Sequence, residues 1–104
     1  MIAYATYHTI SLRTYIIEID CIEYTYKGET SYKILSPPQF KHQDWKAHSV
    51  YKTKIQAFNA AVGELRFYYN RQKEGGIDYT EDFFMRRIAE ISFLPLDYTG
   101  WGWL

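Results

Sequence analysis

Three histidines, one cysteine and a few closely spaced acids are the residues of this sequence that could do chemistry. The histidines are His8, His42 and His48, and the cysteine is Cys21. Metal sites that can be recognised in a sequence have ligands at short fixed spacings. His42 and His48 lie in a predicted loop, which gives them no shared geometry. The sequence therefore predicts surface histidines and no metal site. It predicts a buried, unreactive side chain for Cys21.

Glu18 and Asp20 are the acidic pair with the most suggestive spacing. They alternate along a predicted strand and so project from the same face. Two carboxylates can bind Mg²⁺ or exchange protons with a substrate, which makes a metal-dependent enzyme the weakest of three functional hypotheses. The sequence has neither a phosphate-binding glycine loop nor a nucleophile motif. We therefore expect a solvated acidic face, no catalytic residue and no cofactor.

A basic and aromatic segment, residues 32–54, is the more informative feature. Cations beside aromatic rings can bind single-stranded nucleic acid, and they can also anchor an acidic protein surface. The residues expected to contact a partner are Phe40, Lys41, Trp45, Lys46, Tyr51, Lys52 and Lys54. An alternative is that Phe40 and Trp45 pack beneath the loop while the lysines remain in water.

The first third of the chain has the alternating pattern of β-strands. We expect strands over residues 2–10, 14–26 and 30–35, with Gly28 in a tight turn between the last two. The apolar positions of the second strand change from odd to even numbers, which predicts a bulge or bend near Asp20–Ile22.

The same pattern predicts which side chains face each other in the last two strands. Tyr32 and Ile34 are expected to lie across from Tyr24 and Tyr26.

Two helices are expected in the rest of the chain. The longer covers about residues 53–72 and is capped by Thr53, and the shorter covers about residues 80–92 after Thr80. The predicted buried stripe of the longer helix is Ile55, Phe58, Val62, Leu65 and Tyr69. Tyr79 is expected to pack onto the second helix. Strands followed by helices predict a single α+β domain over residues 1–104, with an antiparallel sheet of about three strands.

The longer helix carries a second group of residues opposite its stripe. Phe67 falls on that side with Ala60 and Gly63. A large aromatic side chain beside two small residues predicts a surface that another element covers. Phe67, Trp101 and Trp103 therefore form a second candidate interface, and a homodimer is one way to cover it.

Composition narrows the class of protein. The net charge is zero, which gives no general attraction to nucleic acid or membrane. The charge is nevertheless uneven: residues 27–73 have nine cations against three acids, a net charge of +6, and both flanking regions are acidic. A single cysteine favours a reducing compartment, and no apolar run is long enough to span a bilayer. We therefore expect a cytoplasmic location.

These observations favour a small non-catalytic protein-binding module. It would occlude a partner's surface as an inhibitor or accessory protein, such as a phage-type antagonist of a host defence complex. This hypothesis includes a viral origin, and it rests on small size and on the lack of catalytic motifs. The alternative is a nucleic-acid-binding module that uses residues 32–54.

Overall fold

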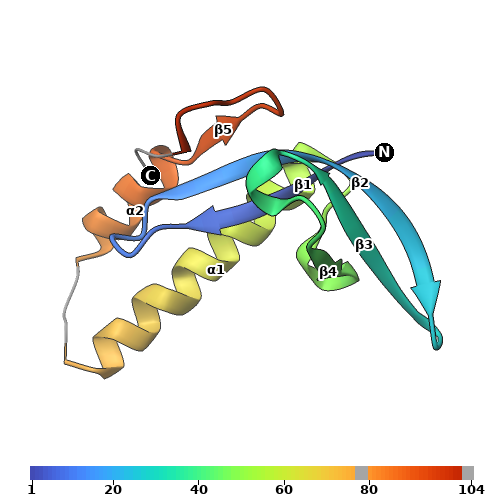
Figure 1. The fold of residues 1–104 in the computed structure, drawn as a ribbon. Coiled ribbons are helices and arrows are strands. Elements are labelled where there is room, and N and C mark those ends of the chain that lie inside the picture. Colours follow the sequence, from blue (N-terminus) through green and yellow to red (C-terminus); the bar gives the residue numbers. More distant parts are fainter. Residues whose placement is uncertain (77–79, 102–104) are drawn as a thin grey trace.

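Figure 1 shows a computed structural model in which one long helix crosses a curled, mainly antiparallel sheet. The structure describes residues 1–76 and 80–101. The domain is α+β, as the sequence predicts. The predicted packing of Tyr79 and the predicted interface residue Trp103 lie outside the described residues.

Within the described residues, the sheet has five strands instead of about three. Its neighbouring strands in order are β1 (Ile2–His8), β2 (Thr14–Tyr26), β3 (Glu29–Ser36) and β4 (Asp44–Lys46), and β5 (Ser92–Leu94) pairs in parallel with β2. Short 3-10 turns, η1 (Pro38–Phe40) and η2 (Ala47–Ser49), flank β4. β4 and β5 are three residues each, which is too short for an alternating pattern to be recognised.

β2 is thirteen residues long and has different neighbours along its length. Its first half pairs with β1 on one edge and β5 on the other, while its second half pairs with β3. The end of β2 and the start of β3 therefore project from the body of the protein as a hairpin (Figure 1).

The predicted position of an irregularity is confirmed, since the pairing of β2 with β3 shifts between Asp20 and Cys21, but the predicted change of faces within β2 is wrong. Asp20 lies opposite Ser36 and Cys21 lies opposite Ile34, so the extra residue is Leu35 on β3. Because β2 itself gains no residue, its side chains keep alternating between the two faces.

The expected pairing of Tyr24 and Tyr26 with Tyr32 and Ile34 is wrong. The turn consists of two residues, Lys27 and Gly28, with φ angles of 52° and 80°. Positive φ at both positions is the geometry of the two-residue hairpin turn. This turn is one residue shorter than the loop assumed from the sequence, and a one-residue shift reverses the faces. Tyr24 consequently lies opposite Ser31.

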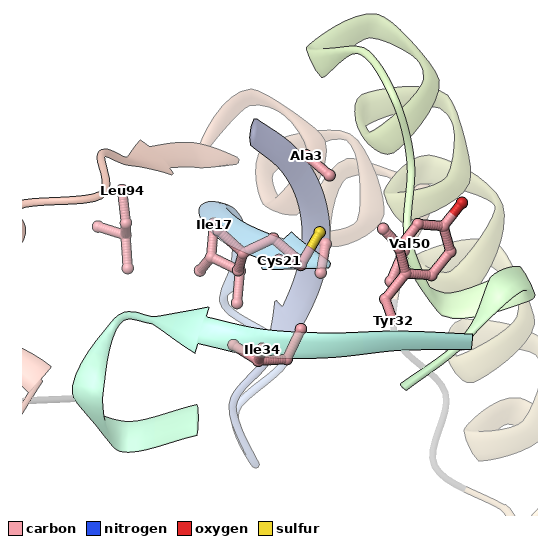
Figure 2. Packing of buried hydrophobic residues seen from close by; sticks show 9 residues of the cluster. Ala3, Ile17, Cys21, Tyr32, Ile34, Val50 and Leu94 are labelled. Atoms are coloured by element: carbon pink, nitrogen blue, oxygen red, sulfur yellow. The ribbon is translucent and has the colours of Figure 1, made fainter. Parts of the chain in front are cut away.

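The largest buried cluster lies on one face of the sheet (Figure 2). Its buried members are Ala3, Ala5, Ile17, Ile19, Cys21, Tyr32, Ile34, Val50 and Leu94. Cys21 is fully buried, as predicted. Each large aliphatic side chain in this cluster contributes about 1.5–3 kcal/mol through its removal from water.

The longer helix, α1 (Lys54–Glu74), packs against the opposite face of the sheet. The predicted cap is confirmed, because the Thr53 side chain accepts a hydrogen bond from the Gln56 N–H at 3.2 Å. The predicted stripe is only partly right: Leu65 and Tyr69 are buried, whereas Ile55 and Phe58 are exposed. Ala57 and Ala61 are buried instead, against Ile16, since small side chains let the helix approach the sheet closely.

The second helix, α2 (Glu81–Ala89), ends the helical part of the chain and returns it to the sheet. Thr80 caps it as predicted, by accepting a hydrogen bond from the Phe83 N–H. Phe84 is buried against Tyr69 of α1, with ring centroids 5.6 Å apart. Beyond β5, the Leu96 N–H donates to the Glu18 carboxylate at 3.0 Å and holds the returning chain against β2.

Candidate binding surfaces and a polar groove

The projecting hairpin presents three apolar or aromatic side chains to solvent. Ile22 is 52% exposed, Tyr24 is 37% exposed and Tyr26 is 66% exposed. They occupy alternate positions of β2 and so lie on the same face. We call this surface the hairpin face. Grouped exposed aromatic and aliphatic side chains of this kind are typical of protein-binding surfaces.

Charged side chains border the hairpin face. The cross-strand neighbours from β3 and β4 on this face are Lys33, Asp44, Lys46 and Glu29. The Tyr24 hydroxyl donates to Asp44 at 3.0 Å, and this hydrogen bond raises the pKa of Tyr24. The Lys46 ammonium donates to Glu29 at 3.1 Å. An apolar centre with a polar border is the arrangement found in specific protein interfaces.

The structure places the predicted aromatic contacts Phe40 and Trp45 in an aromatic cluster of the protein itself. Their rings lie 5.3 Å apart, and Phe40 is also 5.3 Å from Trp101. Trp101 in turn contacts Tyr7 and Tyr98. The cluster packs against the main core. Phe40, Trp45 and Trp101 are half-buried, so they offer little free ring surface for a partner.

The predicted basic contacts do not form one continuous surface with these rings. Lys41 and Lys52 are exposed, while Lys46 is engaged by Glu29 as described. The Lys54 ammonium lies 3.9 Å from the centroid of the Phe93 ring, over β5. Tyr51 is half-buried and its backbone pairs with Tyr4.

The sequence predicts that another element covers Phe67, but Phe67 lies on an exposed side of α1. This side chain is 56% exposed and touches Tyr68 and Arg71. Apart from its chain neighbours and the adjacent backbone of α1, no atom of the described residues lies within 4 Å of the position that a Cβ on Gly63 would occupy. Trp101 packs against the main core cluster, on the face of the sheet opposite α1, so the structure does not bring it together with Phe67.

A groove of about 540 Å³ lies between the end of β1 and the segment that runs through β4 and η2. Its lining residues are Ala5, Thr6, His8, Asp44, Trp45, Lys46, His48, Ser49, Tyr51 and Glu64. Pockets that bind ligands usually have volumes in this range.

A polar network lies on the α1 side of the groove. The Glu64 carboxylate accepts a hydrogen bond from Thr6 at 3.0 Å and is paired with the His8 ring. The other ring nitrogen of His8 shares a 2.8 Å hydrogen bond with the Thr14 hydroxyl. The network joins two strands to α1. The hydroxyl of Thr14, the ring of His8 and the carboxylate of Glu64 are connected in the order found in hydroxyl–histidine–carboxylate sites for nucleophilic catalysis.

Burial argues against a catalytic use of this network. Thr14 is 1% exposed, so a substrate cannot reach its hydroxyl. Among the described residues, no group of three or more His, Cys, Asp and Glu side chains is arranged to hold a metal ion. Glu18 accepts the Leu96 N–H, and Asp20 is bonded to the amino group of Met1. These bonds give both carboxylates a structural role.

Sequence reasoning missed the contact of His8 with Glu64, because the two residues are 56 positions apart. The sequence contains one signal for this contact, because Thr6 and His8 are two positions apart on a predicted strand and so lie on the same face. Glu64 also precedes the buried Leu65 on α1. A helix laid over that face brings the carboxylate near both side chains.

Searches with protein-family models, among curated proteins and among solved structures found no match to this chain. Neither helix in the described part of the chain combines the length and the apolar character needed to cross a bilayer.

Proposed function

We propose that this chain is a small non-catalytic protein-binding module that occludes a surface of a partner protein, as an inhibitor or accessory protein. The observation that carries the proposal is the hairpin face. Ile22, Tyr24 and Tyr26 are exposed together on a hairpin that projects from the body of the protein. Tyrosine is favoured at binding surfaces because it gives a large contact area with little loss of conformational entropy.

In this proposal the hairpin face is the principal contact surface, in place of the basic and aromatic segment of residues 32–54 that the sequence suggested. Phe40 contacts both Trp45 and Trp101, which supports the alternative that the rings of the loop pack beneath it. Exposed Lys41 and Lys52 then serve as peripheral charges that steer an acidic partner.

The test compares two exposed aromatic residues on different surfaces. Tyr26→Ser alters the hairpin face, and Phe67→Ser alters the open side of α1; the two side chains are 66% and 56% exposed. Tagged wild-type and variant proteins are used to recover partners from source cells, with quantitative mass spectrometry. We expect that one partner recovered by the wild-type protein is not recovered by Tyr26→Ser but is still recovered by Phe67→Ser.

Other outcomes of this comparison contradict the proposal. Loss with Phe67→Ser alone assigns binding to α1, and retention by both variants excludes the hairpin face. Light scattering of the same proteins tests the predicted homodimer through Phe67. A cytoplasmic location remains part of the proposal and is tested by cell fractionation.

Nucleic acid is the second candidate ligand for the hairpin face. Tyr24 and Tyr26 could stack on bases, and Lys33 lies on the same face. Asp44 and Glu29 also lie there and repel phosphates, which is why a protein partner is preferred. Fluorescence anisotropy with labelled single-stranded DNA and RNA at low salt tests this candidate. Binding that weakens steeply with added salt would favour nucleic acid.

A further inference from the structure

One edge of β1 is left open beyond a single backbone bridge. Tyr4 exchanges backbone hydrogen bonds with Tyr51, on the side of β1 away from β2. In an antiparallel strand, the backbone groups of alternate residues point to the same edge. The N–H and C=O groups of Thr6 and His8 therefore point the same way as those of Tyr4. Within residues 1–76 and 80–101, no strand pairs with β1 at this edge beyond Tyr51.

The open edge forms one wall of the groove described above. β4 and η2 form the opposite wall, and Glu64 of α1 lies along one side. The groove thus offers backbone donors and acceptors in a row, within a space bounded on several sides. Unpaired groups on a sheet edge are complementary to the backbone of an extended polypeptide, which can join the sheet as a further strand.

The charges in the groove indicate the kind of side chain that fits. Glu64 and Asp44 contribute two carboxylates. The ammonium group of Lys46 is already paired with Glu29. Asp44 has no ion pair among the described residues, and the ionic partner of Glu64 is the His8 ring, so the groove favours an added positive charge. A lysine or arginine on the added strand would be attracted to the Glu64 side.

We propose that an extended segment of a partner protein, carrying a basic side chain, adds as a strand to β1 at Thr6 and His8. The single bridge from Tyr51 already uses this edge in the manner proposed. This second site extends the proposed protein-binding function to the groove, which shares Asp44 and Lys46 with the border of the hairpin face but does not include Ile22, Tyr24 or Tyr26. The peptide described below tests it independently.

The probe is the peptide acetyl-Thr-Val-Thr-Lys-Thr-Val-Thr-amide, titrated to millimolar concentration into the ¹⁵N-labelled protein. We expect the amide signals of Thr6 and His8 to shift and their hydrogen exchange to slow. Two further peptides are N-methylated at either the odd or the even positions. One of them must lose binding, because methylation removes the N–H groups that pair with the edge.

Two changes test the basic side chain. Replacing the peptide's lysine by glutamate, or Glu64→Gln in the protein, should weaken binding about two- to fivefold, the range of an exposed ion pair. The peptide change needs no alteration of the protein, so it stays informative if Glu64→Gln disturbs the fold. Tyr26→Ser should leave peptide binding unchanged.

Three results would overturn the proposal: no shift at Thr6 and His8, equal binding of all methylated peptides, or loss of binding in Tyr26→Ser. None of these results depends on recovering a partner from cells. Failure of this site and failure of the hairpin face are therefore distinguishable.

Discussion

Tyr4 and Tyr51 exchange both of their backbone hydrogen bonds, at 2.8 and 2.7 Å, and so join the loop after η2 to the free edge of β1. Through this bridge the chain that leaves β4 returns to the first strand, and the sheet curls toward closure. The bridge also places Val50, buried in the main cluster, next to β1. One residue pair thus fixes the long connection between β3 and α1.

Tyr51→Pro should destabilise the protein by about 1–3 kcal/mol, because proline removes the N–H and leaves the Tyr4 carbonyl without its donor. Tyr51→Phe is the matched control, since it keeps the backbone donor and the ring. Urea unfolding of both variants measures the difference. Equal stability of the two variants would show that the bridge adds nothing.

Ile34→Ala and Ile22→Ala compare the same substitution on the two faces of the sheet. Ile34 is fully buried, and its truncation should cost about 2–5 kcal/mol. Ile22 is 52% exposed, so its truncation should cost less than about 0.5 kcal/mol. Thermal and urea unfolding check both values. A large cost at Ile22 would contradict its assignment to the hairpin face.

Burial raises the pKa of the Cys21 thiol; the amino group of Met1 opposes this increase, and the charges of Asp20 and Glu23 reinforce it. The folded state therefore favours the protonated thiol. This contribution to stability is complete below the ordinary thiol pKa and is lost as pH rises through the raised value. We expect the stability difference between wild type and Cys21→Ala to shrink from pH 7 to pH 10. A constant difference in urea unfolding would refute this.

The Arg66 guanidinium donates two hydrogen bonds to Glu81, at 3.0 and 3.2 Å, and links α1 to α2. These bonds lower the pKa of the Glu81 carboxyl. The stabilisation is present above the ordinary glutamate pKa and is lost as pH falls through the lowered value. NMR titration should show Glu81 titrating lower in wild type than in Arg66→Gln. Identical titration curves would mean that the pair does not form in solution.

Local signals predicted much of this fold. Thr53 and Thr80 cap their helices as expected, Gly28 takes positive φ in the turn, and Cys21 is buried. Each of these features depends on a few neighbouring residues, whose hydrogen bonds and steric limits are nearly the same in any protein.

The features that depend on distant contacts were not predicted. Hydrophobicity alone selected Ile55 and Phe58 for the buried side of α1, but the sheet accepts Ala57 and Ala61 because a close approach requires small side chains. The hairpin register depended on whether the turn has two or three residues. Glu64 meets Thr6 and His8 only because α1 lies across β1.

The bond from the Leu96 N–H to Glu18 joins residues 78 positions apart. At a synthesis rate of about 5–20 residues per second, roughly 4–16 s separate the appearance of the two partners on the ribosome. Throughout that interval the apolar edge of β2 at Tyr15–Ile17 lacks its pairing partner β5. Until residues 92–96 have been synthesised, the nascent chain therefore has an incomplete sheet with an exposed apolar edge, which the pairing of β5 with β2 then covers.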